Sequence, residues 1–212
     1  MQALWQNPVI RVSLMLALFA ISATALVALT EENTRAQIAE NEREALLEAI
    51  SVLVPEDQFD NQILQDTITL PATPALGTTE DSSVFRARMN NEPVAAVFTT
   101  VAPDGYSGSI RMLIGIYVDG SIAGVRVINH KETPGLGDKI DVKRNDWILQ
   151  FAGLSLGQPE KSQWHVKKDG GQFDQFTGAT ITPRAVVKAI RGALEYFEAN
   201  RDELFAKGED TP

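Results

Sequence analysis

The run from Ile110 to Ile128, Ile-Arg-Met-Leu-Ile-Gly-Ile-Tyr-Val-Asp-Gly-Ser-Ile-Ala-Gly-Val-Arg-Val-Ile, is the part of this sequence that decides the fold. Two stretches rich in branched apolar residues, 110–118 and 122–128, flank Asp119-Gly120, a dipeptide that favours a tight β-hairpin turn. Residues 84–89 and 94–101 form a second such pair around Asn90-Asn91-Glu92-Pro93. Four strands joined locally predict an antiparallel sheet with helices on one face, and therefore an α+β fold.

On the C-terminal side, the apolar residues recur with helical spacing from Pro183 to Phe205. Thr182 is predicted to be the N-cap of this helix, and Pro183 suits its first position. A shorter helix is expected around Trp147, Ile148 and Phe151, and a third hairpin is expected to pair 164–166 with 173–176. Residues 56–81 contain two prolines and a glycine with little periodicity, so we expect an irregular connection there.

The N-terminal region predicts a membrane anchor. Val12–Leu29 is uncharged and long enough to cross a bilayer as a helix. Arg11 precedes it and acidic residues follow it, a bias that places the N-terminus in the cytoplasm. A cleaved signal peptide is the rival interpretation, but the apolar run continues past Ala25 and the basic region before it is meagre, which favours a retained anchor. Residues 31–54 predict a further helix that Pro55 ends.

The composition excludes several classes of function. The chain has 212 residues, no cysteine, two histidines and a net charge of −9. Disulfides, thiolate metal sites and cysteine nucleophiles are therefore excluded, and a histidine metal site is not expected. The acidic charge argues against binding of nucleic acid. The sequence contains no Walker loop, no dinucleotide fingerprint and no Gly-x-Ser-x-Gly turn, so neither free nucleotide binding by those routes nor a hydrolase triad is supported.

A glycine-rich loop, His130–Asp138, follows the last predicted strand. Pro134, Gly135 and Gly137 require a tight path, and Leu136 is the one large apolar residue in it. Two interpretations are open at this point: an ordinary loop that tucks one leucine into the core, or a wall that lays Leu136 against a flat ring. Glu132 and Asp138 are candidates for an acid–base pair, although charged residues in such loops are usually solvated.

The nine residues Asp174-Gln-Phe-Thr-Gly-Ala-Thr-Ile-Thr182 are the strongest functional candidate. Gly178 and Ala179 lie between the hydroxyls of Thr177 and Thr180, and small residues let another molecule approach the backbone. The helix that begins immediately afterwards offers unpaired N–H groups and partial positive charge to a phosphate. From the residues alone, a phosphate-holding turn and a capped turn without a ligand remain equally open.

This stretch resembles the flavinylation motif Asp-x-x-(Ser/Thr)-Gly-Ala-Thr, in which a flavin transferase joins FMN through its phosphate to the last threonine. Residues from about Val84 to the end of the last helix also resemble the FMN-binding domain family. That family is shared by the G component of the Rnf (Rsx) electron transport complex and the C component of the sodium-translocating NADH:quinone reductase. The matching stretches are 102–108, 132–140 and 173–186. Their residues and the compact length of the chain are closer to the Rnf protein.

The resemblance implies a site and a cofactor. FMN would be attached covalently to Thr180. The ring would be lined by Glu132, Thr133, Leu136 and Gly137, with Gly178 giving access to the backbone. Lys168 and Thr177 would be polar contacts, Tyr106 a further one, and Lys167 an alternative to Lys168.

The resemblance also implies an organisation and partners. Residues 1–30 would form the cytoplasmic N-terminus and the anchor, 31–55 a juxtamembrane helix, 56–206 a periplasmic FMN-binding domain and 207–212 a disordered tail. The protein would be a single-pass subunit of the bacterial inner membrane. It would relay electrons within a complex that couples electron transfer between ferredoxin and NAD to ion translocation. Its partners would be the other Rnf subunits and the flavin transferase. The alternatives are the corresponding protein of the quinone reductase, a membrane-anchored FMN redox sensor and an envelope scaffold without flavin.

Overall fold

The computed structural model describes residues 8–206, except for the side chains at positions 36, 39 and 42. The predicted tail, 207–212, lies outside the described residues. The chain divides between Leu46 and Leu47 into two compact units. Helix α2, Pro8–Leu53, runs through the first unit and contributes its last turns to the second. It ends before Pro55, as the sequence predicts.

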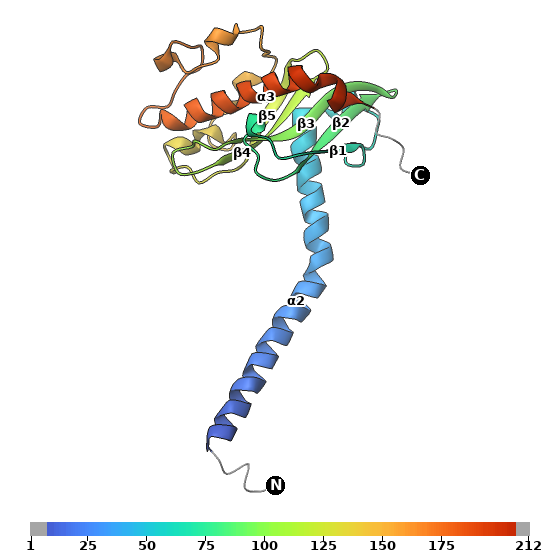
Figure 1. Cartoon of the computed structure of the whole chain (residues 1–212), viewed down its shortest axis with the longest axis vertical. Coiled ribbons are helices and arrows are strands. Elements are labelled where there is room, and N and C mark those ends of the chain that lie inside the picture. Colours follow the sequence, from blue (N-terminus) through green and yellow to red (C-terminus); the bar gives the residue numbers. More distant parts are fainter. Residues whose placement is uncertain (1–7, 207–212) are drawn as a thin grey trace. The chain divides into compact units, whose positions relative to one another are not determined.

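The second unit is built on a five-stranded antiparallel sheet in the order β1-β2-β3-β4-β5, which confirms the α+β class (Figure 1). The strands are β1 Thr67–Leu70, β2 Ser82–Met89, β3 Glu92–Ala102, β4 Ile110–Tyr117 and β5 Ile122–Asn129. Four of them are the predicted ones. β1 lies within 56–81, so the expectation that this whole segment is irregular is wrong. The two predicted hairpins are confirmed by the pairing of β2 with β3 and of β4 with β5.

The turns of these hairpins follow from their own residues. Asn90 and Asn91 both adopt positive φ, 50° and 66°, which asparagine tolerates and a two-residue hairpin turn requires. Gly120 has φ of 89° in the turn between β4 and β5. In that turn the Asp119 side chain accepts hydrogen bonds from the backbone and hydroxyl of Ser121, and these bonds lower the pKa of Asp119.

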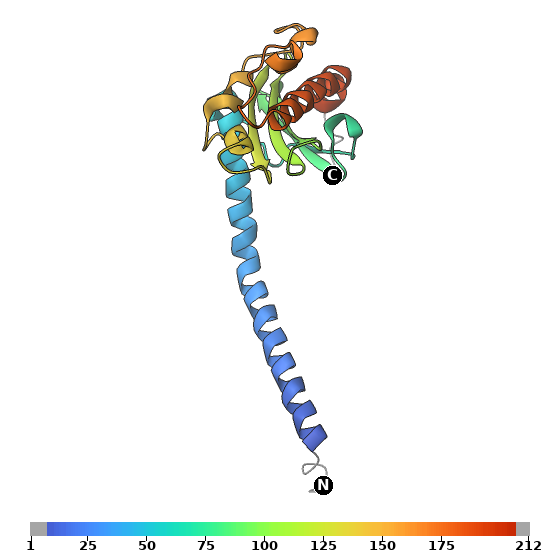
Figure 2. The same cartoon turned by 90° about the vertical axis from the view of Figure 1, so that its left-hand side faces the viewer.

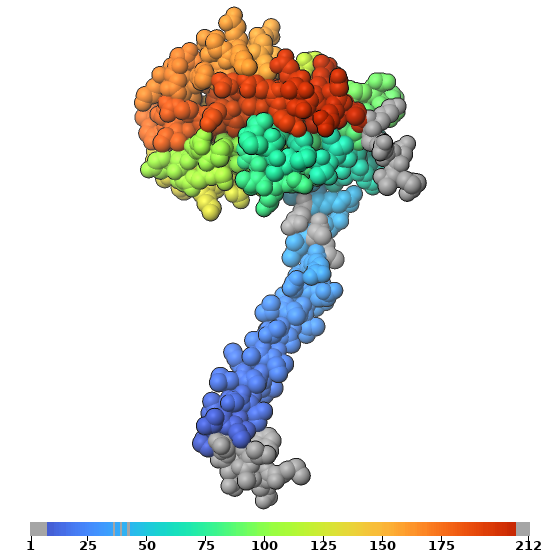
Figure 3. Space-filling model, in the orientation of Figure 1, coloured from blue at the N-terminus to red at the C-terminus, as the bar shows by residue number. Residues whose placement is uncertain are grey.

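Helix α3, Ile181–Phe205, packs on one face of the sheet against β3 and β4 (Figures 1 and 2). Alternate residues of β3 share the main core with the buried side of α3. Ala96 and Phe98 belong to that core together with Val186 and Ile190 of the helix. Figure 3 shows the outer side of α3 (red) at the surface of the domain.

The opposite face of the sheet is also covered. Because side chains alternate along a strand, Ala95 and Val97 of β3 point away from α3, and both are fully buried. Val97 pairs with Gly115, which pairs in turn with Gly124. A Cβ built on Gly124 would lie 2.9 Å from Leu53 Cδ2, so the end of α2 rests on the backbone of these two glycines.

The segments between β5 and α3 are short 3-10 helices and turns: η3 Gly137–Ile140, η4 Asp146–Phe151, η5 Lys161–Gln163 and η6 Lys167–Asp169. Two other 3-10 helices precede β2: η1 Glu56–Gln58 and η2 Pro74–Leu76. The predicted helix around Trp147 is η4, and it buries Trp147, Ile148 and Phe151. The predicted third hairpin is wrong, because Val166 and Phe173 form only an isolated parallel bridge. Trp164, Phe173 and Phe151 instead pack their rings together in the core.

Candidate functional site

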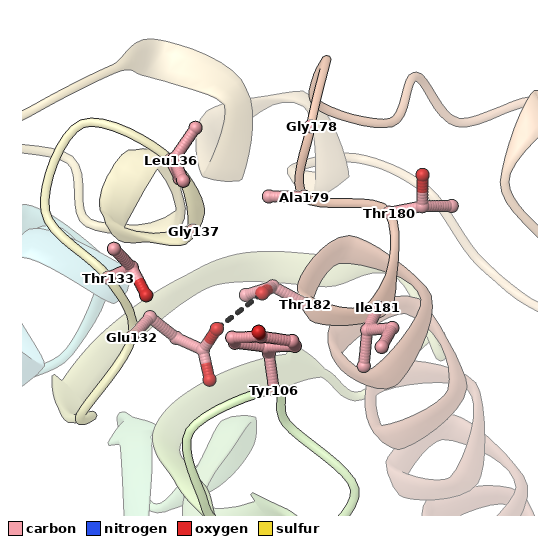
Figure 4. A pocket seen from close by; sticks show the side chains of 10 residues that line it. All are labelled: Tyr106, Glu132, Thr133, Leu136, Gly137, Gly178, Ala179, Thr180, Ile181 and Thr182. Carbon is pink, nitrogen blue, oxygen red and sulfur yellow. Dashed lines mark hydrogen bonds between the residues drawn. The ribbon is translucent and has the colours of Figure 1, made fainter.

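The glycine-rich loop after β5 and the start of α3 face each other across a pocket of about 290 Å³ (Figure 4). This volume lies at the lower end of the range of small-molecule sites, about 300–1,000 Å³. The lining residues come from three segments that are distant in the sequence: Tyr106, Glu132, Thr133, Leu136, Gly137, Gly178, Ala179, Thr180, Ile181 and Thr182.

Glu132 lies at the polar end of the pocket and is 4% exposed. One carboxylate oxygen accepts a hydrogen bond from the Ser107 backbone N–H at 3.1 Å. The other accepts a short hydrogen bond from the Thr182 hydroxyl. The carboxylate thereby fastens the loop after β3, the loop after β5 and the first turn of α3 to one another.

Thr182 is not the N-cap that the sequence predicts. Helix α3 begins at Ile181, with Thr180 at the cap position and no side-chain cap hydrogen bond. Thr182 is the second residue of the helix and therefore cannot occupy the cap position. Thr182 is fully buried inside the first turn, where its hydroxyl donates to Glu132. The Thr182 hydroxyl is therefore already engaged within the protein.

The apolar part of the pocket is formed by Tyr106, Leu136, Ala179 and Ile181. Leu136 and Ile181 are 42% and 45% exposed, so they present open apolar surface. In Figure 4 the Leu136 and Ala179 side chains approach each other across the opening, and the Tyr106 ring lies beside Glu132 and Thr182. A flat apolar group with a polar edge would meet both kinds of surface here.

Two glycines keep the pocket open. A Cβ on Gly137 would lie 2.7 Å from the Glu132 carboxylate and 2.8 Å from the Thr182 hydroxyl. Gly178 has φ of 82°, a conformation that side chains disfavour, and its Cβ would point at Leu136 Cδ2 at 3.5 Å. Any larger residue at either position would narrow the space between the two walls.

Thr180 lies at the edge of the pocket and is partly exposed. Its side chain points away from the Glu132–Thr182 pair in Figure 4. The preceding turn is held by buried Phe173 and Phe176, and the Trp147 indole donates to the Asp174 carbonyl at 2.8 Å. Buried aromatic rings thus fix a turn whose residues Thr177 and Gly178 are exposed.

Ion pairs surround this turn. Lys167 contacts the Asp174 carboxylate at 2.7 Å. Arg184 donates two hydrogen bonds, of 2.6 and 2.8 Å, to Asp169, and this contact lowers the pKa of Asp169 and raises the pKa of Arg184. Lys168 is exposed in η6, where its backbone N–H donates to Gln175.

Seven of the ten predicted site residues, counting Tyr106 and the alternative Lys167, line the pocket together: Tyr106, Glu132, Thr133, Leu136, Gly137, Gly178 and Thr180. Thr177, Lys167 and Lys168 do not line it, although all three lie on the segments leading to Thr180. Sequence reasoning missed Ser107 and Ile181. Ser107 contributes only its backbone N–H, which no side-chain pattern reports.

Comparison with known proteins identifies the family. A model of the FMN-binding domain matches residues 105–195, and a model of the RnfG N-terminal region matches residues 1–53. The G subunit of the ion-translocating oxidoreductase complex of Pseudoalteromonas atlantica is 48% identical over 193 residues, which cover 91% of this chain and 90% of that protein. The chain belongs to the family of ion-translocating oxidoreductase complex G subunits.

Other members of the family match over nearly the whole length. The G subunit of Pseudomonas aeruginosa is 46% identical over 209 residues, covering 99% of this chain and 98% of the relative. That of Vibrio atlanticus is 45% identical over 201 residues, covering 95% and 96%. The matched FMN-binding domain begins at Gly105 and includes every residue that lines the pocket. The family resemblance predicted from the sequence is therefore confirmed.

Proposed function

We propose that this protein is a membrane-anchored flavoprotein that carries FMN on Thr180 and relays electrons within an ion-translocating oxidoreductase complex. The observation that carries the proposal is the position of the Thr180 hydroxyl, at the edge of a pocket within the FMN-binding domain. Bound flavin supplies electron exchange, singly or in pairs, which side chains do not provide. The names of the relatives support membership of the complex.

The residues present suit the flavin. The apolar walls at Leu136 and Ile181 suit the faces of a fused ring, and Glu132, Thr133 and Thr182 form the polar part of the pocket. Gly137 and Gly178 leave the space that a ring needs between the walls. Thr177 and Lys168, which lie outside the lining, are proposed as polar contacts of the phosphate-bearing part.

Attachment requires an accessible hydroxyl. Thr180 is partly exposed, in contrast to the buried Thr182, so a flavin transferase has one available threonine at the start of α3. In the proposed reaction the transferase supplies FMN activated as a phosphoanhydride. The Thr180 oxygen loses its proton and attacks the FMN phosphorus, the anhydride P–O bond breaks, and the activating phosphate group leaves with the electron pair. The exposed Asp174 is proposed to be read by the transferase.

The proposed location follows from α2. Pro8–Arg35 is long and apolar enough to cross a membrane, and the helix continues without a break to Leu53. The apolar run continues past Ala25 to Leu29, which favours a retained single-pass anchor over a signal peptide cleaved there. With Arg11 on the cytoplasmic side, the flavin domain would face the periplasm of the bacterial inner membrane. There the protein would exchange electrons with other subunits of a complex that links ferredoxin and NAD to ion movement.

Fluorescence of the denatured protein in a gel tests the attachment. The parent chain, produced with the flavin transferase, is expected to give a fluorescent band and a mass increased by one FMN minus one water. Thr180→Ala should be dark and unmodified because no acceptor oxygen remains. Thr180→Ser keeps a hydroxyl and should retain at least part of the signal.

Two results would contradict the proposal. A parent chain without a mass adduct would favour the alternative of an envelope scaffold without flavin. A fluorescent Thr180→Ala band would show that FMN is attached to a residue other than Thr180. A redox sensor would carry the same adduct, and it would function in cells that lack the other subunits of the complex. Deletion of those subunits separates the sensor from the relay.

A further inference from the structure

Glu132 is a buried carboxylate with an unusual set of neighbours. Both of its oxygens accept hydrogen bonds, one from the Ser107 N–H and one from the Thr182 hydroxyl. An ionised carboxylate is purely an acceptor, so this arrangement suits the charged form. Thr182 also belongs to the first turn of α3, where the helix dipole favours a negative group.

In the part of the chain that the structure describes, this carboxylate has no cationic partner. Within residues 8–206, the described ion pairs include none with Glu132. The other residues lining the pocket are aromatic, aliphatic, hydroxylic or glycine, and none is basic. Neighbouring His130 accepts through Nδ1 from the Glu132 backbone N–H, so its ring does not donate to the carboxylate from that nitrogen.

The space for the carboxylate is reserved by glycines. A Cβ on Gly105 would come within 2.9 Å of one Glu132 oxygen, and a Cβ on Gly137 within 2.7 Å of the other. Glu132 lines the pocket directly, and Figure 4 shows its carboxylate turned towards Thr182 and the Tyr106 ring. A fixed charge is thus placed at the wall of the pocket, where exclusion of water makes its field stronger than in solution.

We infer that Glu132 is a potential-setting residue, whose negative charge lowers the reduction potential of the flavin held in this pocket. The inference rests on the proposed function. Electrons that enter the pocket meet a fixed charge of the same sign, so the reduced state is disfavoured relative to the oxidised state. The bound flavin therefore becomes a stronger electron donor to the next carrier.

Reductive titration of the full-length, flavin-loaded protein tests the inference. Dithionite supplies the electrons, the buffer supplies the protons, and flavin absorbance is followed against a reference dye. Glu132→Gln keeps the size of the side chain and removes the charge. Its amide oxygen can still accept from the Ser107 N–H, and its NH₂ group can donate to the Thr182 oxygen once that hydroxyl rotates. The ratio of reduced to oxidised flavin at a fixed potential is expected to rise about tenfold, equivalent to ~30 mV for two electrons or ~59 mV for one.

Two further variants separate charge from structure. Thr182→Val keeps the shape and the Glu132 charge but removes one hydrogen-bond donor. This variant should lower the reduction potential of the flavin, because the Glu132 carboxylate then lacks the hydroxyl dipole that partly offsets its negative charge. Glu198→Gln removes an exposed charge of α3 that does not line the pocket, and it should leave the potential unchanged.

The opposite signs make the inference falsifiable even if one variant fails to fold. An unchanged or lower potential for Glu132→Gln overturns it. If that variant does not accumulate, an unchanged or higher potential for Thr182→Val overturns it instead. A parent chain that shows no covalent flavin in a denaturing gel would contradict the proposed function. A parent chain that carries the flavin, together with variants whose potentials do not shift as expected, would contradict only the inference about Glu132.

Discussion

Gly137 is the residue at which the parts of the pocket meet. It packs against both the Glu132 carboxylate and the Thr182 hydroxyl, so closely that a Cβ at this position would overlap with both groups. The neighbouring atoms are buried and hydrogen-bonded to each other, so they cannot move aside without losing that bond. The loop after β5 therefore closes on α3 only when this position lacks a side chain.

Gly137→Ala is expected to lower the free energy of unfolding by about 2 kcal/mol, in the range found for overpacked sites. The variant should also load less flavin, because the Glu132–Thr182 contact would be displaced. Chemical denaturation of the detergent-solubilised chain and in-gel flavin fluorescence measure the two effects. Gly157→Ala is the matched control, since a Cβ there meets nothing within 4 Å and φ is not positive. Equal stability of the two variants would contradict the prediction.

At this scale the sequence was informative for residues that share a local motif and uninformative for distant partners. The segments around Leu136 and Thr180 were both recognised, and both line the pocket. The role of Thr182 was assigned wrongly because the helix begins at Ile181, and the contact that Thr182 does make is with Glu132, fifty residues away. Capping rules consider only neighbours along the chain, whereas the tertiary fold brings Glu132 to Thr182.

Among the elements, β2 carries a buried charge cluster that ties the edge of the sheet to the end of α3. Arg86 and Arg88 are 5% and 6% exposed and share Asp66, at 2.5 and 2.8 Å. The same guanidinium groups donate to the carbonyls of Phe205 and Ala206 at the C-terminus of α3. The negative end of the helix dipole and one carboxylate thus face two buried cations.

Asp66→Asn should destabilise the domain by about 3 kcal/mol. Removing one partner of a buried ion pair costs about 3–5 kcal/mol, and the partial exposure of Asp66 places it at the lower end. Thermal or urea unfolding followed by circular dichroism checks this value. Asp104→Asn is the control, because its pair with Lys188 is exposed and such pairs contribute about 0–1 kcal/mol. A loss for Asp66→Asn no larger than that of the control would rule out a structural role for the cluster.

The short length of β1 explains why this strand was not predicted from the sequence. β1 has only four residues, and it is followed directly by Pro71, so its periodicity is too short to be distinguished from a loop. Its pairing with β2 is accompanied by long-range contacts of Asp66, the residue just before it. By contrast, β4 and β5 are longer, are rich in branched apolar residues and flank a strong turn signal, and they were found from the sequence.

For the molecule as a whole, the border between the two units does not coincide with the end of a helix. Ile50 and Leu53 of α2 are at most 1% exposed and belong to the second unit. Leu53 lies on Gly115 and Gly124, whose missing side chains leave room for it. The sequence predicts a helix over residues 31–54, but the paired glycines on β4 and β5 gave no signal in the sequence, because their partner is far away in the chain.

Leu53→Ala is expected to cost about 2–5 kcal/mol, because it leaves a cavity over two glycines that have no side chains with which to fill it. Urea denaturation of the full chain measures this loss. The exposed Val52, one position earlier, provides the control, and Val52→Ala should change the stability little. Fragments give a second measurement: residues 47–212 should be soluble and melt cooperatively, whereas residues 55–212 should aggregate. A stable 55–212 fragment would contradict this prediction.

The packing of Leu53 on Gly115 and Gly124 also determines where this chain can be joined to a segment of another protein in a chimera. A chimera that exchanged the membrane segment at Pro55 would discard part of the domain's own interior. A splice within the charged stretch between residues 31 and 46 would leave that interior intact and free the hydrophobic segment for replacement. The modular boundary of this protein thus lies inside a continuous helix, where no loop marks it.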